Sequence, residues 1–274
     1  MAPKFLSEPE PERGVPLAVI PGVWRVVANN PGPMTYHGTN TYLIADGGGM
    51  TVLDPGPDDP AHVEAVIAAA GGPITRILLS HGHRDHTGAV MRLRAATDAP
   101  VFGFSPSVNP EIAIDHALAD GSTVSGLTAL HTPGHAADHL CYATENGSLF
   151  TGDHVMTWST SVVSPPHGDM AAYFASLDRL AARTDRYYLP GHGPLLGRTA
   201  GFAKALLAHR KQREEAVGAT LKETPVALGE LTAEAYPGLD PKLRRAAERN
   251  VLAHLLKLAA EGRAREVDGL WAAA

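Results

Sequence analysis

The sequence has almost no cysteine and no long apolar run, and these two absences exclude broad classes of protein. Cys141 is the one cysteine among 274 residues, so an internal disulfide bond and a cysteine-based zinc finger are both excluded. The apolar runs fall far short of the ~20 residues that a membrane-spanning helix needs. The first residues, MAPKFLSEPEPERG, carry acids and prolines where a signal peptide has an apolar stretch. We therefore expect a cytoplasmic protein that does not associate with a membrane.

Positive charge and several catalytic signatures are also missing. The chain has 23 Lys and Arg against 29 Asp and Glu, a net charge of -6, which excludes a polycation that binds nucleic acid over its whole surface but leaves a local basic patch open. It contains neither a Gly-x-Ser-x-Gly nucleophile elbow nor a phosphate-binding GxxxxGK[ST] loop. Cys141 lacks the surroundings of a nucleophile.

What the sequence does contain is a regular series of short strands and helices in residues 15–199. The first half has strand patterns near 17–20, 23–28, 41–45, 50–53, 74–79 and 101–104, with helical patterns at 62–70 and 87–96. The second half has strands near 127–131, 139–144, 148–150 and 187–189, with a helix at 170–184. Two β-rich halves, each followed by helices, predict an α/β protein with an αββα sandwich.

Two segments flank this predicted catalytic domain. Residues 1–14, in which Pro and Glu alternate, are expected to form a disordered tail. Residues 200–274 show helical patterns at 201–222, 228–236 and 241–262, then a short hairpin or wing near 265–271, which indicates a winged-helix-like module. Because the helices of this module carry many leucines, we expect it to pack on the sandwich and to wall one side of the active-site groove.

The strongest chemical signal is HGHRDH, residues 81–86, which directly follows a predicted strand. Residues two apart in extended chain point to the same side, so His81 and His83 can bind one metal ion together. The next helix must then turn the chain and direct Asp85 and His86 toward a second position. Imidazole and carboxylate ligands suit Zn²⁺ first, then iron or manganese.

Three distant residues are candidates to complete two metal sites. They are His135 in HTPGH, Asp153 in LFTGD and His192 in LPGHGP, each after a strand or at a tight turn. The neighbouring Gly and Pro residues let the backbone approach a buried centre closely, and catalytic residues concentrate on such loops.

In the order and spacing of these motifs, the chain resembles the metallo-β-lactamase superfamily over roughly residues 15–195. The resemblance implies that His81, His83 and His135 bind a first metal ion. It implies that Asp85, His86 and His192 bind a second, and that Asp153 bridges the two. Two ions ~3.5–4 Å apart can lower the pKa of a shared water and yield a bridging hydroxide near neutral pH. Asp85 is also our candidate catalytic residue, as a proton shuttle.

Other histidines are weighed against the same pattern. His139 resembles the second histidine of the family's PGHxxxH motif, and we expect it to support the ligands from behind. The orientation of His154, which follows the bridging position, stays open. The remaining histidines are interpreted as ordinary core or surface residues; these are His37, His62, His116, His131, His167, His209 and His254.

With its C-terminal module, the whole chain is similar to the β-lactamase-like protein 2 family, whose relatives include glyoxalase II and carrier-protein thioesterases. This likeness rests on TNTYL at residues 39–43, LDPGP at 53–57, SHGHRDHTG at 80–88 and PGHGP at 190–194. The segment VMTWSTSVVSPPH, residues 155–167, departs from the family and is expected to shape the pocket. The true β-lactamases of the superfamily have Cys or Ser where this chain has Asp153, so antibiotic hydrolysis is at most a weak side activity.

Two substrate classes stay open. We favour a thioester or other small acyl substrate, with single-stranded RNA, as in an endoribonuclease of the β-lactamase-like protein 2 family, as the alternative. A basic face that could attract phosphates would comprise Arg244, Arg245, Arg249, Lys257, Arg263 and Arg265. The same charges also fit a solvated helix surface with pairs four residues apart, such as Arg244 with Glu248. A homo-oligomer is compatible with the sequence.

Overall fold

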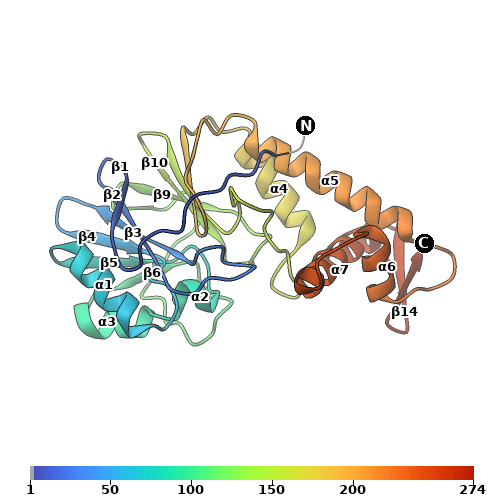
Figure 1. Ribbon diagram of the computed structural model, residues 1–274, viewed down its shortest axis with the longest axis horizontal. Helices are drawn as coiled ribbons and strands as arrows, with labels where there is room; N and C mark the ends of the chain where they lie inside the picture. The colour runs from blue at the N-terminus through green and yellow to red at the C-terminus, as the bar shows by residue number, and fades with distance from the viewer. Residues whose placement is uncertain (1–2) are drawn as a thin grey trace.

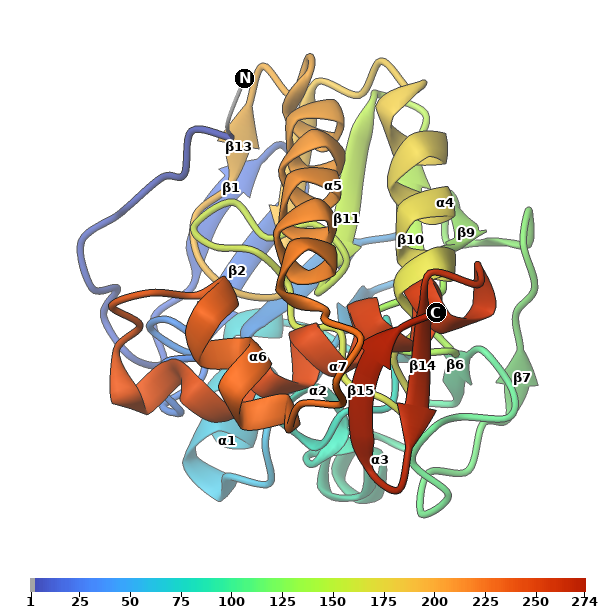
Figure 2. The ribbon, with the colours of Figure 1, turned by 90° about the vertical axis from the view of Figure 1, so that its right-hand side faces the viewer.

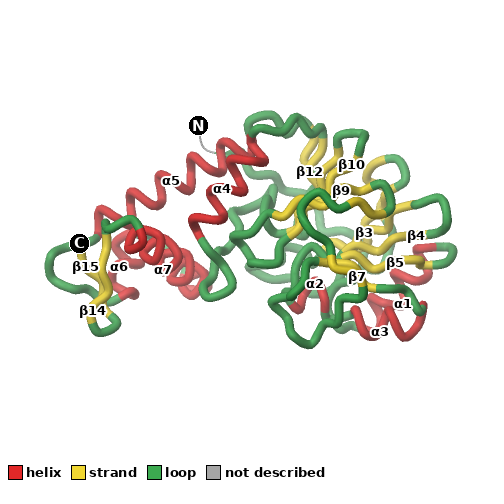
Figure 3. Tube along the Cα trace, turned by 180° about the vertical axis from the view of Figure 1, so that it is seen from behind, coloured by secondary structure: helices red, strands yellow, loops and turns green. Residues whose placement is uncertain are grey.

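The computed structural model describes residues 3–274 and contains two packed β-sheets with helices on both outer sides (Figure 1). The predicted αββα sandwich is confirmed, as is the winged-helix domain at the C-terminus. Loops gather on the side of the sandwich that faces the C-terminal helices (Figure 3). Within residues 3–274, no helix combines the length and apolar composition needed to cross a membrane.

The first sheet has seven strands in chain order. Strands β1 to β4 pair antiparallel, whereas β4 to β7 pair parallel. Helices connect β4 to β5 and β5 to β6, and a loop connects β6 to β7. Its strands are β1 (Leu17–Ile20), β2 (Val23–Val27), β3 (Asn40–Ala45), β4 (Met50–Leu53), β5 (Ile74–Leu78), β6 (Val101–Gly103) and β7 (His116–Ala117).

The second sheet has six strands in the order β13-β12-β11-β10-β9-β8. Its pairs are antiparallel except for β11 with β12, which are parallel and are connected through helix α4 (Met170–Ala181). The strands are β8 (Thr123–Val124), β9 (Leu127–His131), β10 (Leu140–Thr144), β11 (Ser148–Gly152), β12 (Tyr187–Pro190) and β13 (Leu196–Gly197).

Apolar side chains fill three layers between these elements. Leu78, Leu140 and Phe150 are among the buried residues between the two sheets. Helices α1 (Pro60–Ala70) and α3 (Val90–Thr97) cover the outer face of the first sheet. Helices α4 and α5 (Phe202–Thr220) cover the second (Figure 2). The strand ends that carry the ligand loops are therefore held on a rigid double sheet.

The predicted helix at 87–96 is corrected by the structure, which has two pieces. Helix α2 (Arg84–Thr87) is separated from α3 because the N–H of Ala89 bonds to the carbonyl of Gly56, 3.0 Å away in another loop. Gly88 lies against the same loop, where an added Cβ would come within 2.6 Å of the Asp58 nitrogen. This contact fixes α2, which carries two predicted ligands.

The C-terminal module is built from α5, α6 (Leu228–Ala235), a 3₁₀ turn (Pro241–Leu243), α7 (Arg244–Ala260) and the hairpin β14 (Ala264–Val267) and β15 (Leu270–Ala273). Its own apolar core includes Leu231, Leu255 and Trp271. Helix α5 belongs to both parts, because Leu206 packs on the sandwich and Val217 on the module. The long helix thus joins the module to the catalytic domain (Figure 1).

Residues 3–14 have no regular secondary structure, but they lie along the protein instead of forming a disordered tail. The N–H of Leu6 bonds to the carbonyl of Thr157 at 2.9 Å. Both carboxylate oxygens of Glu8 bond to the guanidinium of Arg25, at 3.0 and 2.9 Å. Because Arg25 is buried, Glu8 supplies the charge that it needs, and the expected disorder is corrected here. Residues 1–2 of that predicted tail lie outside the described residues.

Candidate metal centre

The HGHRDH segment begins three residues after the end of β5, and its backbone follows the geometry that its spacing predicted. His83 still has extended backbone, with φ -64° and ψ 143°, and the helix α2 begins at the next residue. The extended part brings Nε2 of His81 to 2.9 Å from Nδ1 of His83. The helical turn then carries Asp85 and His86 to the other side of the centre.

The first candidate metal-binding group consists of His81, His83 and His135. His135 lies in the loop between β9 and β10, and its Nε2 is 3.0 Å from Nδ1 of His83. Ligand atoms about 2.0–2.1 Å from one ion in a tetrahedral arrangement lie about 3.3–3.4 Å apart. The separations of 2.9 and 3.0 Å are slightly shorter than this, so the three nitrogens lie close enough together to bind one ion.

The second group consists of Asp85, His86 and His192. His192 follows β12, and its Nε2 lies 3.2 Å from Oδ2 of Asp85 and 3.3 Å from Nε2 of His86. Nε2 of His86 is 3.6 Å from the same Asp85 oxygen. These separations also fit three ligands around one ion.

Asp153 follows β11 and lies between the two groups. Its Oδ1 is 3.5 Å from Nε2 of both His86 and His192, whereas its Oδ2 is 3.6 Å from Nε2 of His135. Each oxygen of one carboxylate thus faces a different group. Oδ1 is buried and has no hydrogen-bond partner within residues 3–274. This is the arrangement of a carboxylate that bridges two metal ions, and the residues present fit a dinuclear site.

The charges of the site match this interpretation. Burial opposes the protonation of His86 and His192, but the nearby carboxylates of Asp85 and Asp153 outweigh it. They raise the pKa of His86 well above its usual value and that of His192 to about 9. Burial and the nearby His135 lower the pKa of His83 to about 3. Without an ion, the protons on His86 and His192 balance the two carboxylates, and a bound cation would replace these protons.

Asp54, which was not identified from the sequence, contacts ligands of both metal-binding groups on the side away from the cavity, directly or through Ser80. Oδ2 of Asp54 lies 2.9 Å from Nδ1 of His86 and accepts a hydrogen bond from the Ser80 hydroxyl at 2.6 Å. The same hydroxyl lies 3.0 Å from Nδ1 of His81. Asp54 has a left-handed backbone, with φ 53°, which is unusual for a residue other than glycine. The available signal was the LDPGP motif, which entered the sequence analysis only as part of the family likeness.

His139 lies behind Asp153, as expected of a supporting residue. Its Nε2 accepts a hydrogen bond from the backbone N–H of Asp153 at 3.2 Å. Nδ1 must then carry the ring proton and donate to Oγ1 of Thr132, 2.9 Å away. Gly152 allows this approach, because an added Cβ would lie 2.6 Å from Nε2 of His139. His139 thus fixes the backbone that presents the bridging carboxylate.

His154, whose orientation was open, lies outside the metal groups and is fully buried beside the ring of Tyr173, at 4.6 Å. Within the described part of the chain, neither of its ring nitrogens has a hydrogen-bond partner. Burial lowers its pKa to about 3, so the ring is neutral. His62, which was expected to be ordinary, is buried with its Nε2 2.9 Å from the Thr41 hydroxyl.

A cavity of about 530 Å³ opens over the centre. Asp85, His135 and Asp153 line it on the metal side. The opposite wall comes mainly from the divergent segment 155–167 and from Met34 and is largely apolar; it contains Met156, Val162, Ser164, Pro165, Pro166 and His167. Arg249 of α7 also lines the cavity, so the C-terminal module contributes a wall, as expected.

Comparison with known proteins agrees with this arrangement. Residues 34–110 and 103–192 match the family described as the metallo-beta-lactamase superfamily. Residues 228–271 match the beta-lactamase associated winged helix domain. The two matches correspond to the sandwich with its metal centre and to the C-terminal module.

Individual proteins resemble the chain over most of its length. A "Beta-lactamase-like protein 2 homolog" of Drosophila melanogaster is 33% identical, over 91% of this chain and 94% of its own. An "Atrochrysone carboxyl ACP thioesterase" of Claviceps purpurea is 29% identical, over 73% and 65%. The crystal structure of a metallo-beta-lactamase family protein from Thermus thermophilus superposes with a TM-score of 0.80 at 25% identity, covering 94% of this chain and all of that one. The chain therefore belongs to the metallo-beta-lactamase superfamily and is a hydrolytic enzyme, as the HGHRDH motif implied.

Proposed function

We propose that the protein is a zinc-dependent hydrolase of thioesters or other small acyl substrates. The observation that carries this proposal is the largely apolar wall of the cavity over the metal centre. Of the six basic residues that could have formed a phosphate-attracting face, only Arg249 lines this cavity in the described chain. The relative named as an acyl carrier protein thioesterase supports the same substrate class.

Three of the other five basic residues of that face are paired with carboxylates. Arg244 pairs with Glu248 at 3.1 Å, and Arg263 pairs with Glu215 at 3.1 Å. Lys257 lies 2.7 Å from Glu214. Charges that are already paired with carboxylates are poorly suited to bind a phosphate backbone, so an apolar acyl group fits the cavity better.

Acyl hydrolysis needs an activated water molecule, a polarised carbonyl and a group that moves a proton. Two Zn²⁺ ions, or iron or manganese in their place, would polarise the scissile carbonyl and lower the pKa of a water molecule. Asp85, which is a third exposed and faces the cavity, is placed to accept a proton from that water and to return it to the leaving group. The other carboxylate, Asp153, is buried between the metal-binding groups, and we assign it the role of a bridging ligand and not of a proton acceptor.

Single-stranded RNA is the second candidate substrate, favoured by one observation. Arg84 and Arg249 both line the cavity, and a phosphodiester also benefits from two metal ions. A β-lactam is at most a side substrate, because Asp153 stands where the true β-lactamases have Cys or Ser. All seven proposed ligands come from one chain, so the metal site requires no second subunit. We also propose that the protein is cytoplasmic and needs no membrane.

Parallel turnover of a short-chain acyl thioester and a single-stranded RNA by zinc-loaded protein tests the proposal. We expect thioester hydrolysis that is abolished by chelation and restored by Zn²⁺, with little RNA cleavage. Asp153→Ala is the control for contaminating hydrolases, because it removes the bridge. Rapid RNA cleavage without thioester turnover would contradict the proposal and favour the nuclease.

A further inference from the structure

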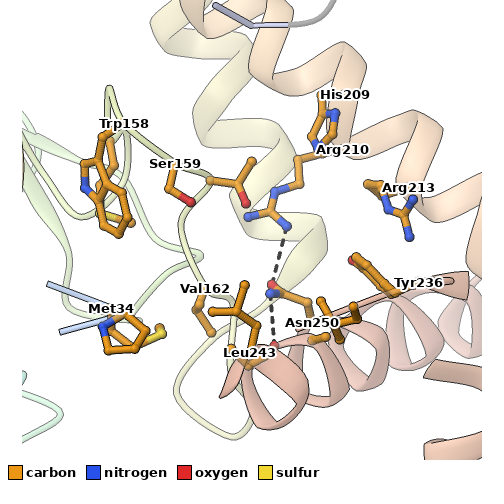
Figure 4. Close-up of a pocket in the computed structure, with 16 residues that line it drawn as sticks. Met34, Trp158, Ser159, Val162, His209, Arg210, Arg213, Tyr236, Leu243 and Asn250 are labelled. Atoms are coloured by element: carbon orange, nitrogen blue, oxygen red, sulfur yellow. Dashed lines mark hydrogen bonds between the residues drawn. The ribbon is translucent and has the colours of Figure 1, made fainter. Parts of the chain in front are cut away.

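A second, smaller cavity of about 150 Å³ (Figure 4) shares three lining residues with the metal cavity. It lies between the segment after β11, the helices α5 and α7, and the connection between α6 and α7. Met34, Met156 and Val162 line both cavities, so no other layer of the protein needs to separate the two. A volume of about 150 Å³ accommodates a group of about the size of benzene.

Helix α5 places three basic side chains at this cavity. Figure 4 shows His209, Arg210 and Arg213 on the helix side of the cavity, across from Tyr236 and Asn250. Arg210 is 2% exposed, and within residues 3–274 neither Arg210 nor Arg213 has a carboxylate within 4.0 Å. Both guanidiniums are therefore cations without a matching anion.

The hydrogen bonds that these guanidiniums make are to neutral groups. Arg210 donates to the carbonyl of Ser161 and, at 3.4 Å, to Oδ1 of Asn250. Arg213 donates to the carbonyl of Ala235 and stacks over the Tyr236 ring, 3.8 Å from its centroid. In the described chain, the buried Nε atoms of both arginines have no partner.

Nε1 of Trp158, at the same cavity, is another buried donor without a partner among the described residues. A buried cation without a counter-charge is costly, and carbonyl and ring contacts offset this cost without neutralising the charge. An excess of donors over acceptors is what an anion-binding site needs before its ligand arrives. Leu239 and Leu243 in the wall add an apolar surface for the part of the ligand that carries the anion.

We propose that this cavity binds a carboxylate or phosphate group of the substrate through Arg213 and Arg210, while the scissile acyl bond lies at the metal centre. The proposal rests on the proposed acyl hydrolase function and defines its substrate as an anionic one. The anion has two sources: a carboxylate on the acyl group, or a phosphate on the thiol that leaves. Both would be recognised by the same pair of guanidiniums.

Two matched pairs of thioesters test this assignment and separate the sources. The first pair has an acyl group ending in a free carboxylate or in its methyl ester. The second has one acyl group on 4′-phosphopantetheine or on pantetheine. In wild-type protein, we expect the anionic member of one pair to have the higher kcat/KM, chiefly through a lower KM. Arg213→Gln should reduce that ratio about 10- to 100-fold, as expected for the loss of a charged hydrogen bond.

Lys211→Gln is the matched control, because it removes one positive charge from the exposed side of the same helix. It should leave the anionic preference unchanged, and Arg213→Lys, which keeps the charge, should recover part of it. Thermal unfolding of each variant checks that the fold is intact. An equal preference in wild type and Arg213→Gln, or an equal loss in Lys211→Gln, would overturn the proposal.

A binding measurement without turnover separates the cavity from the reaction. Calorimetric titration with benzoate, phenyl phosphate and benzyl alcohol should show that an anion binds wild type more tightly than the alcohol, and that Arg213→Gln loses this difference. If this loss occurs but no thioester is hydrolysed, the anion site stands and the proposed function fails. If thioesters are hydrolysed but neither anion binds better than the alcohol, the function stands and the anion site fails.

Discussion

Oδ1 of Asn250, on helix α7, accepts a hydrogen bond from the backbone N–H of Val163, 3.0 Å away. Arg210 of α5 donates to the carbonyl of Ser161, two residues earlier. Between these two anchors, the carbonyl of Val162 lies 2.6 Å from Nδ1 of His135. The C-terminal module therefore holds the segment that orients a proposed metal ligand, although it supplies no ligand itself.

This connection predicts that Asn250→Ala weakens metal binding, although Asn250 is not one of the proposed ligands. Removal of the amide frees the Val163 N–H, so the Val162 carbonyl fixes the His135 ring less firmly. We expect about 10-fold weaker binding of metal, at the lower end of the losses typical for residues behind the ligands. Competition with a chromophoric chelator measures it, and Arg245→Gln, exposed on the same helix, is the control. Unchanged affinity in Asn250→Ala would show that the module only covers the site.

The geometry of Asp153 predicts a different outcome for the bridge and its support. Zinc-loaded wild type should approach two metal ions per chain by elemental analysis. Asp153→Ala should lose at least one of them and nearly all turnover while the protein stays folded. His139→Ala should lose only ~10–100-fold in activity, because it fixes the backbone of Asp153 and not the metal. Equal damage from both substitutions would contradict this ranking of the two residues.

Asp54 is predicted to affect both metal-binding groups at once. Asp54→Asn keeps the size of the side chain but removes the negative charge that faces His86 and Ser80. We expect both metal-binding constants to fall, each by ~10–100-fold. Stepwise titration with zinc resolves the two constants. A decrease confined to one of them would mean that Asp54 orients only one group.

The buried Glu214 is predicted to stabilise the C-terminal module. Burial acts to raise its pKa, but the hydrogen bonds from His254 and Lys257 outweigh it and hold the pKa below its usual value. The resulting stability is present above the unfolded pKa of about 4.3 and is lost as the pH falls through the lower folded value. Glu214→Gln should cost about 1–3 kcal/mol in the free energy of unfolding at pH 7.

The neighbouring Glu215 gives this prediction a matched control. It pairs with Arg263 on the surface, and its side chain is 70% exposed, so Glu215→Gln should change the stability by less than about 1 kcal/mol. Urea unfolding at pH 7 and at acidic pH compares the two variants. The deficit of Glu214→Gln should shrink with acidification, and a deficit that is independent of pH would refute the charge-based explanation.

The substrate class predicts the response to Arg244, Arg245 and Arg249 changed together to Gln. An uncharged thioester should be hydrolysed at nearly the wild-type rate, because only Arg249 lines the metal cavity. If RNA is cleaved, the triple variant should bind it more weakly and with a smaller salt dependence, by about 0.7 in slope per lost phosphate contact. RNA cleavage that ignores both the substitutions and the salt would exclude this face as the RNA path.

The ligand residues could be found from the sequence because their chemistry is local. The spacing of His81 and His83 in extended chain, followed by a helix that carries Asp85 and His86, needs only backbone geometry. The structure brings these four together with His135, Asp153 and His192, while their role as metal ligands stays a prediction. The strand and helix pattern likewise determined the αββα sandwich, since alternation and helical periodicity are encoded within each segment.

Only the tertiary structure decided the features that depend on distant residues. In the sequence, Asp54 was only one residue of the LDPGP motif, and its contact with His86 depends on how β4 and β5 are paired in the sheet. The split of the helix at Gly88 depends on the loop that contains Gly56. The attachment of residues 3–14 to the surface of the protein depends on the buried Arg25, which binds Glu8. No sequence motif marked the two arginines of α5, and only the packing of α5 against α7 and the segment 155–167 placed them at a buried cavity. Local patterns specify which residues can bind a metal, whereas burial and long-range hydrogen bonds, which determine the shape of the pocket, arise only when the whole chain is folded.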